Sequence, residues 1–166
     1  MSDERPEVTI YTDGGCESNP GGPGGYGVVL ISQQGQGKRK ELSGGFRSTT
    51  NNRMELYAAI RGLEALKVPC RVTLYSDSQY LVKAMTEGWA QKWKKNNWWR
   101  NKKEKAANPD LWERLLSLCR THEVDFRWVR GHAGHPGNER CDELAMLALQ
   151  KKDLPSDKGY EQSAQE

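Results

Sequence analysis

The sequence predicts a single α/β domain in which a five-stranded mixed sheet is flanked by helices. Three observations support this fold class. The 166 residues suit one hydrophobic core. Strand-like and helix-like apolar patterns follow the order strand, strand, strand, helix, strand, helices, strand, helix. Strands joined by turns pair antiparallel and strands joined through helices pair parallel, so we expect three antiparallel strands followed by two parallel ones.

The first three strands are expected to form consecutive hairpins. Residues 7–13 alternate Val8 and Ile10 with other residues and run into a glycine pair. Residues 26–32 are more continuously apolar, which favours a buried strand. The third strand, residues 38–47, contains two glycines, and glycine-rich connections separate the three strands.

Helices alternate with strands in the rest of the chain. A helix begins near Asn51 and is expected to stop before Pro69, because proline cannot continue a helix. Asn108-Pro109-Asp110 is a typical start for a later helix. The other expected elements are strand 71–77, helix 78–88, a helix followed by a loop within 89–105, a helix to residue 120, strand 123–130, a glycine-rich loop at 131–137 and helix 138–150.

The limits of these patterns set the expected domain organisation. Residues 1–6 are expected to form an N-terminal extension and residues 7–150 the folded domain. Residues 151–166 are polar without an apolar period, so we predict a disordered tail. No apolar run approaches the ~20 residues that span a bilayer, and no secretory signal is evident. We therefore expect a cytoplasmic protein without membrane contact, and we expect it to be a monomer.

The four cysteines are widely spaced and include no CxxC pair. They are Cys16, Cys70, Cys119 and Cys141. Free thiols in a reducing compartment explain this spacing better than disulfides or a zinc site.

Positive charge is concentrated in one segment. Residues 89–105 contain seven of the 25 basic residues and one of the 22 acidic residues, which leaves 18 basic and 21 acidic residues elsewhere. Four tryptophans are interleaved with these cations. Tryptophan faces beside charged groups suit packing on sugars and phosphates, so the segment indicates a nucleic-acid partner. A solvated helical face is the alternative.

Four carboxylates lie where α/β proteins assemble functional sites. Asp13 and Asp77 close the first and fourth expected strands, and sites collect at the carboxyl ends of strands. If these strands are neighbours, the two acids lie side by side. Glu55 and Asp142 each lie one turn inside a helix, beside apolar residues.

Converging carboxylates need a cation, because like charges cannot all stay ionised at close range. Oxygen ligands select hard ions such as Mg²⁺ or Mn²⁺, and two ions roughly 4 Å apart suit phosphodiester hydrolysis. Ordinary roles remain open at this point. Asp13 and Asp77 suit turns or helix caps, and Glu55 and Asp142 suit exposed helix surfaces.

The strings that contain these acids resemble a known family. They are YTDGGC at 11–16, TTNNRMEL at 49–56, SDSQY at 76–80, and GHAGHP at 131–136 followed by NERCDELA at 138–145. Together they resemble bacterial ribonuclease HI, of the type 1 ribonuclease H family, over roughly residues 7–150. One string alone is suggestive, whereas four in the family's order are highly specific.

The resemblance implies a ribonuclease H-like fold and an enzyme that cuts the RNA strand of RNA–DNA hybrids internally. It implies two Mg²⁺ ions, with Mn²⁺ as a possible substitute, and products with 3′-hydroxyl and 5′-phosphate ends. Asp13, Glu55, Asp77 and Asp142 correspond to the family's metal-binding catalytic carboxylates. His132 corresponds to a catalytic histidine on a mobile loop that is thought to aid product release or proton transfer; a structural loop histidine is the alternative.

The resemblance also assigns contacts with the hybrid. Polar amides can contact 2′-hydroxyls, which distinguish RNA from DNA, although helix capping is an alternative for the amides at 51 and 52. The residues implied in groove and backbone contacts are Cys16, Asn19, Asn51, Asn52 and Gln79. Thr50, with Asn19, corresponds to a pocket for a DNA-strand phosphate.

Residues 89–105 correspond to the family's basic protrusion, which holds the DNA strand. Lys94 and Lys95 supply part of its charge. Trp89 and Trp112 correspond to aromatic positions near the DNA sugar.

Two other functions remain as alternatives. One is a different nuclease on the same carboxylate plan, such as an exonuclease, integrase or resolvase; those lack the combination of Asn51-Asn52 with a tryptophan-rich basic protrusion. The other is a non-catalytic module that binds hybrids, which predicts the loss of one or more carboxylates, yet all four are present.

Overall fold

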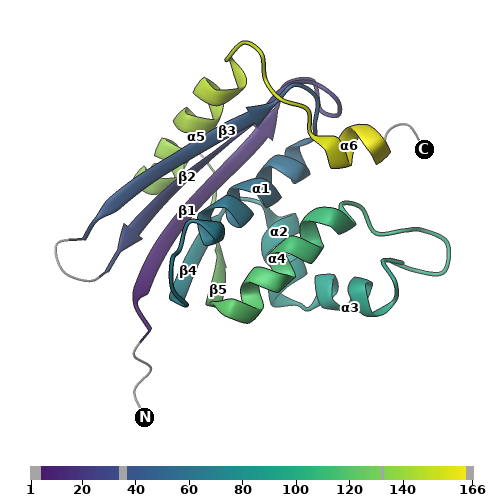
Figure 1. The fold of residues 1–166 in the computed structure, drawn as a ribbon, viewed down its shortest axis with the longest axis horizontal. Helices are drawn as coiled ribbons and strands as arrows, with labels where there is room; N and C mark the ends of the chain where they lie inside the picture. Colours follow the sequence, from purple (N-terminus) through teal and green to yellow (C-terminus); the bar gives the residue numbers. More distant parts are fainter. Residues whose placement is uncertain (1–4, 34–36, 132, 164–166) are drawn as a thin grey trace.

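The structure, a computed structural model of the chain, describes residues 5–33, 37–131 and 133–163. Its centre is a five-stranded sheet in the order β3-β2-β1-β4-β5 (Figure 1). The strands are β1 (Glu7–Cys16), β2 (Gly24–Ser32), β3 (Arg39–Phe46), β4 (Arg71–Ser76) and β5 (Glu123–Trp128). β1 pairs antiparallel with β2 and β2 with β3, whereas β4 pairs parallel with both β1 and β5. The predicted mixed sheet is therefore confirmed.

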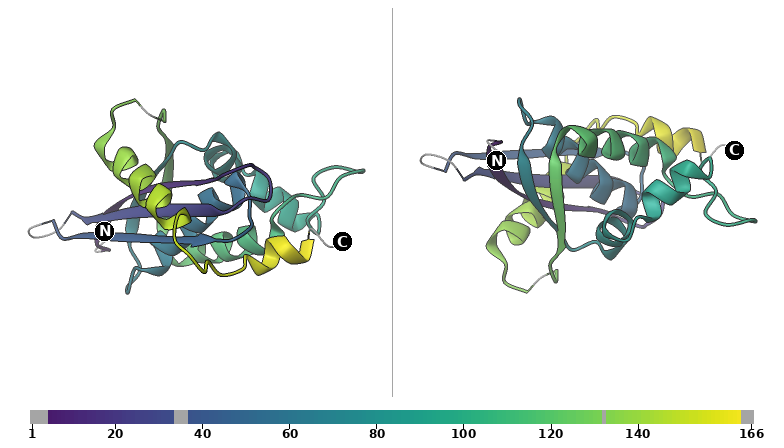
Figure 2. Two further views of the ribbon diagram at one scale, coloured as in Figure 1. Left: turned by 90° about the horizontal axis from the view of Figure 1, so that it is seen from above. Right: turned by 90° about the horizontal axis from the view of Figure 1, so that it is seen from below.

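Helices cover both faces of this sheet (Figures 1 and 2). α5 lies on one face, and α1 lies on the other with α2 and α4 beside it. The helices are α1 (Asn51–Glu64), α2 (Gln79–Thr86), α3 (Trp89–Lys95), α4 (Pro109–Thr121), α5 (Pro136–Leu149) and α6 (Lys158–Ser163). Within the described part of the chain, no helix is both long and apolar enough to cross a lipid bilayer.

Glycines on β2 allow α5 to lie close to the sheet. A Cβ added to Gly25 would overlap the Ala145 carbonyl oxygen, and one added to Gly27 would overlap the Cys141 carbonyl oxygen. On the opposite face, Val28 packs into the apolar core with Ile10 and the buried side of α1. The glycines that interrupt the apolar pattern of β2 therefore form the surface on which α5 packs. α5 carries Asp142.

Several predicted boundaries differ from the observed ones for identifiable reasons. β1 does not end at Asp13, because Gly14 to Cys16 continue to pair with β2. α1 ends at Glu64, well before Pro69, and the Ala65 N–H closes its last turn on the Arg61 carbonyl oxygen at 3.2 Å. α5 begins two residues early, since Pro136 occupies the first helical turn, where proline is well tolerated.

The prediction of a disordered tail after Gln150 is wrong for the described residues up to Ser163. Asp157 is 0% exposed and accepts hydrogen bonds from Arg53 Nε at 2.7 Å and from Thr49 Oγ1 at 2.7 Å. α6 follows directly. The segment has no apolar period because a buried ion pair, and not an apolar helix face, attaches it to the domain.

Candidate active site

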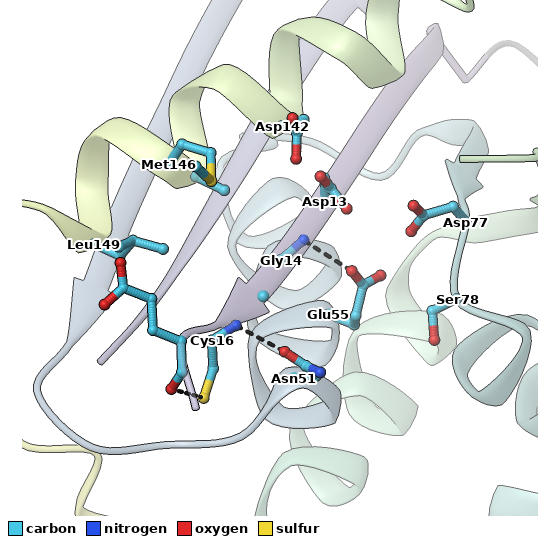
Figure 3. Close-up of a pocket in the computed structure, with 13 residues that line it drawn as sticks. Asp13, Gly14, Cys16, Asn51, Glu55, Asp77, Ser78, Asp142, Met146 and Leu149 are labelled. Atoms are coloured by element: carbon cyan, nitrogen blue, oxygen red, sulfur yellow. Dashed lines mark hydrogen bonds between the residues drawn. The ribbon is translucent and has the colours of Figure 1, made fainter. Parts of the chain in front are cut away.

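The parallel pairing of β1 with β4 places two of the predicted carboxylates together. Tyr11 of β1 is the register partner of Tyr75 of β4, so Asp13 and Asp77 each lie two residues beyond a matched pair. Glu55 of α1 joins them, and one carboxylate oxygen from each of the three lies within 4.8 Å of the others. Figure 3 shows the three side chains pointing into a common space. The sheet and α1 therefore assemble an acidic cluster from three separate parts of the sequence.

Gly14 allows α1 to approach β1 this closely. A Cβ at position 14 would overlap the backbone carbonyl group of Met54, the residue before Glu55. The glycine N–H also donates a hydrogen bond to Glu55 Oε1 at 2.9 Å. Gly14, which follows Asp13 in β1, thus links Glu55 of α1 to the strand that carries Asp13.

Glu55 is held at both of its oxygens. Its side chain is buried, with Oε1 bonded to Gly14 as above, and Ser76 Oγ donates to Oε2 at 3.1 Å. Ser76 Oγ in turn accepts from the Ser78 N–H at 3.0 Å. A carboxylate bonded in this way has a fixed orientation, which is what a ligand to a small cation requires.

The acids oppose one another electrostatically. Burial, followed by repulsion from Asp77, raises the pKa of Asp13 to about 8. Burial, followed by the charge of Asp13, also raises the pKa of Glu55 well above its ordinary value. A divalent cation would remove this conflict, because it favours the ionised form of every carboxylate that contacts it. The all-oxygen donor set therefore fits a hard ion such as Mg²⁺ or Mn²⁺.

Asp142 lies beside this cluster. It projects from α5 into a cavity of about 450 Å³ that Asp13, Glu55 and Asp77 also line (Figure 3). Its charge contributes to the raised pKa of Asp13. Asp142 does not belong to the group of three whose carboxylate oxygens lie within 4.8 Å of one another. The structure thus brings all four predicted acids to one cavity, with three in close contact and the fourth on the facing helix.

The predicted amide residues lie next to the acids and are linked to one another. Asn51 Oδ1 accepts from the Cys16 N–H at 2.7 Å, and the Asn51 N–H donates to Asn19 Oδ1 at 3.0 Å. Thr50 caps α1, because its Oγ1 accepts from the Arg53 N–H at 3.1 Å. The expected alternative of helix capping therefore applies to Thr50 and not to the two asparagines.

Asn19, Thr50, Asn51 and Asn52 line a second cavity, of about 640 Å³, at the start of α1. Cys16 lines the acidic cavity instead, together with Asn51. Asn51 therefore lies between the two cavities and connects them.

Other predicted contact residues surround α2 and α3. Gln79 is exposed as the first residue of α2. Trp89, the first residue of α3, lines a cavity of about 350 Å³ with Tyr80 and Trp93. Lys94 forms an ion pair with Glu113 at 3.2 Å and Lys95 is exposed. The predicted helix followed by a loop at 89–105 is confirmed, and the loop projects beyond the rest of the fold (Figure 2).

The prediction of a substrate contact for Trp112 is wrong in this structure. Its ring is 0% exposed, and its Nε1 donates to Tyr80 Oη at 3.1 Å. Trp93 packs against it with ring centroids 5.9 Å apart. Trp112 therefore supports the base of the basic segment from inside the core. A single tryptophan in a helix pattern does not show by itself whether it faces the core or the solvent.

The predicted catalytic histidine, His132, lies outside the described residues, so its role stays a prediction. His135 was expected to be structural, and its ring packs near those of Tyr11 and Tyr75, with centroids 5.3 and 5.8 Å away. That expectation is consistent with its place at the N-cap of α5.

Two residues near the acids were missed by the sequence reasoning. Ser76 orients Glu55, as described above, and Trp128 Nε1 donates to the Asp77 carbonyl oxygen at 3.1 Å. Ser76 was detectable, because it is a polar residue at an inward position of β4, in line with Val72 and Leu74. The role of Trp128 was not detectable, since it depends on the pairing of β4 with β5.

Comparisons with known proteins agree with this geometry. The family model described as RNase H matches residues 5–150. A curated protein from Rippkaea orientalis named Ribonuclease H is 64% identical over 161 residues, covering 97% of this chain and 96% of that protein. Its counterpart from Trichodesmium erythraeum is 60% identical over 161 residues, covering 97% of this chain and 100% of that protein.

Solved structures show the same fold. The crystal structure of LC9-RNase H1, described as a type 1 RNase H with the type 2 active-site motif, has a TM-score of 0.80 and 32% identity, with 99% of this chain and 83% of that chain covered. LC11-RNase H1, solved in complex with an RNA/DNA hybrid, has a TM-score of 0.65 and 27% identity, with 86% and 96% covered. The sequence strings, the acidic cluster, the family model and these relatives agree, and the chain belongs to the ribonuclease H family.

Proposed function

We propose that this chain hydrolyses the RNA strand of RNA–DNA hybrids at internal positions and leaves 3′-hydroxyl and 5′-phosphate ends. The observation that carries the proposal is the cluster of Asp13, Glu55 and Asp77 with Asp142 facing it across the same cavity. Family membership supports the reaction class, and a structural neighbour solved with an RNA/DNA hybrid supports the substrate.

The four acids would hold two Mg²⁺ ions, with Mn²⁺ as a substitute. Asp13, Glu55 and Asp77 would supply the adjacent carboxylates, and Asp142 would supply a fourth from α5. When bound, the ions activate the attacking water and neutralise charge on the leaving oxygen. Gly14 and Ser76 keep Glu55 in one orientation, so this ligand is already in place before the substrate binds.

Selection of hybrids would come from residues beside the acids. Asn51 and Cys16 border the acidic cavity, where they can contact ribose 2′-hydroxyls, and the Asn51 N–H is bonded to Asn19 Oδ1. The basic segment 89–105 would hold the DNA strand through its phosphates. A substrate that satisfies both surfaces has ribose on one strand and deoxyribose on the other. Gln79, Trp89, Lys94 and Lys95 belong to this proposed contact surface, and His132 keeps its proposed catalytic role.

The test is cleavage of a hybrid with a labelled RNA strand whose two ends are blocked. We expect internal cuts in Mg²⁺ that are absent in EDTA, and no cuts in RNA–RNA or DNA–DNA duplexes. Asp77→Asn should lower kcat by at least about a thousandfold, because it removes one carboxylate of the cluster that would hold the ions. Tight hybrid binding without cutting by the unmutated protein would contradict the enzyme proposal and favour a binding module, whereas cutting only from free ends would favour an exonuclease.

We also propose that the chain acts as a monomer in the cytoplasm. Its four cysteines are free thiols, as expected in a reducing compartment. Light scattering coupled to size exclusion, with a monomer mass of 18.8 kDa as the expected result, tests the oligomeric state.

A further inference from the structure

One tryptophan of the basic segment, Trp99, does not pack against the core. Its neighbours Trp89, Trp93 and Trp98 all do. The indole nitrogen of Trp98 also donates to Glu113 Oε1 at 3.2 Å. Trp99 is 41% exposed, and the loop that carries it projects beyond the rest of the fold (Figure 2). Packing inside the domain therefore does not account for a large aromatic ring at this position.

Backbone contacts hold Trp99 in one place. The residue forms an antiparallel bridge with Lys105 on the returning side of the loop. The next residue, Ala106, is buried, and its N–H donates to the Trp98 carbonyl oxygen at 2.9 Å. The Trp99 N–H donates to the Asn96 carbonyl oxygen at 3.2 Å. Because the main chain is fixed on both sides of the loop, the ring is presented to solvent without a large cost of ordering when a ligand binds.

The ring of Trp99 lies between a cation and a cavity. Lys105 Nζ lies over it, 5.6 Å from the ring centroid. Trp99 also lines a cavity of about 430 Å³ together with Asn96, Asn101 and Lys102. Lys105 is not among the residues that line this cavity, so its cation contacts the ring outside the cavity. The cavity thus combines an aromatic surface, two amide side chains and a second cation.

This combination suits a nucleobase attached to a phosphate. Bases stack on aromatic side chains whatever their sequence, and neighbouring lysines attract the phosphates that connect them. A base inside a duplex already has both faces covered by its neighbours, so a base that stacks on Trp99 has to be unpaired. The loop lies away from the acidic cavity, so a strand that reaches both sites extends beyond the position of cutting (Figure 2).

We propose that Trp99 and Lys102 form a stacking site for one unpaired base of single-stranded DNA that continues from the DNA strand of the hybrid. Trp99 contacts the base and Lys102 pairs with an adjacent phosphate. The site favours hybrids that border single-stranded DNA over blunt hybrids, and it fixes where cuts fall relative to that border. The inference rests on the proposed function, because the basic segment is the part that holds the DNA strand there.

Stacking is measured directly with the fluorescent base 2-aminopurine, whose emission is quenched when it stacks. A short hybrid carries a DNA tail at its 5′ or its 3′ end, with the analogue at each tail position in turn. Binding is followed in Mg²⁺ in an Asp77→Asn background, so that the RNA stays intact. We expect quenching at one position or two adjacent positions of one of the tails. Trp99→Ala and Trp99→Leu should abolish it, whereas Trp99→Phe, which keeps a flat ring, should retain part of it.

Affinity gives the size of the effect. In the same background, the tail should lower the Kd of the hybrid about five- to tenfold relative to a blunt hybrid, and Trp99→Ala should remove this gain. An abasic nucleotide at the quenched position should remove the gain from the protein with Trp99 and should have little further effect on Trp99→Ala, since both changes remove the same contact. Val68→Ala, at another exposed apolar residue, is the control and should keep the full gain.

Cleavage mapping provides a second readout in the protein with all four acids. The tail should concentrate cuts at a fixed distance from the border, and Trp99→Ala should spread them along the RNA. Thermal unfolding checks the fold of each variant. If Trp99→Ala does not fold, the abasic tail still tests the site in the unmutated ring.

Two results would overturn the inference. One is the absence of quenching in both tails, and the other is an equal loss of affinity for blunt and tailed hybrids in Trp99→Ala, which would place the ring on the duplex. A wild-type protein that fails to cut hybrids contradicts the proposed function itself. A wild type that cuts hybrids normally but gains no affinity from either tail contradicts only the stacking site.

Discussion

Asp13 is the residue at which the electrostatic conflict of the site is most evident. Its pKa of about 8 lies far above its ordinary value of 3.8, because it is buried and faces Asp77. Between these two pH values the metal-free folded protein binds a proton that the unfolded chain does not. Because the folded state binds more protons than the unfolded state in this range, the linkage relation requires the unfolding free energy to fall as pH rises from about 4 to about 8.

This linkage gives a testable pH dependence. In EDTA, the unfolding free energy measured with urea should be lower at pH 8 than at pH 5, and added Mg²⁺ should raise it at pH 8. Asp13→Asn should reduce the difference, because the amide at position 13 does not titrate, while the buried Glu55, whose pKa is also raised, retains part of it. Glu143→Gln on the exposed face of α5 is the control and should keep the wild-type dependence. A wild-type protein that becomes more stable from pH 5 to pH 8 in EDTA would contradict the raised pKa.

Ser76 offers a second test at the residue scale. Ser76→Ala removes the donor to Glu55 Oε2 and leaves the four acids unchanged. Loss of a partner that orients a metal ligand typically costs about 10- to 100-fold in metal affinity. We therefore expect the Mg²⁺ concentration for half-maximal cleavage to rise about tenfold or more, with a parallel weakening of Mn²⁺ binding in calorimetry. Ser43→Ala, on the exposed side of β3, should change neither value; an unaltered metal requirement in Ser76→Ala would show that Gly14 alone suffices to orient Glu55.

At the scale of elements, α1 connects the catalytic and structural parts of the domain. Glu55 lies on it next to β1, and Arg53, two residues earlier, joins it to α4 and to the segment before α6. The paired carboxylates outweigh the effect of burial and raise the pKa of Arg53, so the guanidinium stays charged. One helix thus carries both the proposed metal ligand Glu55 and the centre of a buried ion network, Arg53.

The anchor of the C-terminal segment can be tested by stability. Asp157→Asn keeps the size of the side chain but removes the charge that faces Arg53, and loss of one partner of a buried pair typically costs about 3 to 5 kcal/mol. Since Asp110 still pairs with Arg53, we expect about 3 kcal/mol in urea unfolding. Glu161→Gln, which removes an exposed pair, should cost less than about 1 kcal/mol. Equal and small losses in both variants would show that the segment packs independently of the ion network.

At the scale of the whole molecule, charge separates two surfaces. The acidic cavity lies between β1, α1 and α5, whereas the basic loop after α3 projects away from the body (Figure 2). Asn101 Oδ1 accepts the N–H groups of Lys103 and Glu104 at 2.8 and 2.9 Å, which gives this loop a defined shape. Several cations on a loop of defined shape outside the acidic cavity suit a long polyanion more than a small ligand.

Salt dependence measures how many phosphates this loop neutralises. The logarithm of the binding constant falls with the logarithm of the salt concentration, and each lost phosphate contact makes this slope less steep by about 0.9 for a duplex. We expect Lys102→Ala and Lys103→Ala together to reduce the slope by about 1 to 2, whereas Lys67→Ala, in the exposed turn after α1, should leave it unchanged. Affinities are to be measured for one hybrid at several salt concentrations. Identical slopes in all variants would place the DNA strand elsewhere.

The sequence by itself determined the strand and helix order and the mixed sheet, and it singled out the four acids that the structure brings to one cavity. Those features depend on local patterns: alternation along β1 and β4, glycines that permit close approach, and strings around Asp13, Glu55, Asp77 and Asp142. Helix and strand ends were less well predicted, because continued pairing of β1 with β2 and early closure of α1 depend on neighbours.

Only the tertiary structure decided which side chains meet. Trp112 is buried because Tyr80 of α2 and Trp93 of α3 pack against it. Asp157 is held in place by a hydrogen bond from Arg53, a residue 104 positions earlier in the sequence. Ser76 and Trp128 act on the acids through contacts between strands and helices. Local sequence determines backbone periodicity, whereas burial and ion pairing depend on residues distant in the chain, and this is the physical reason for the division.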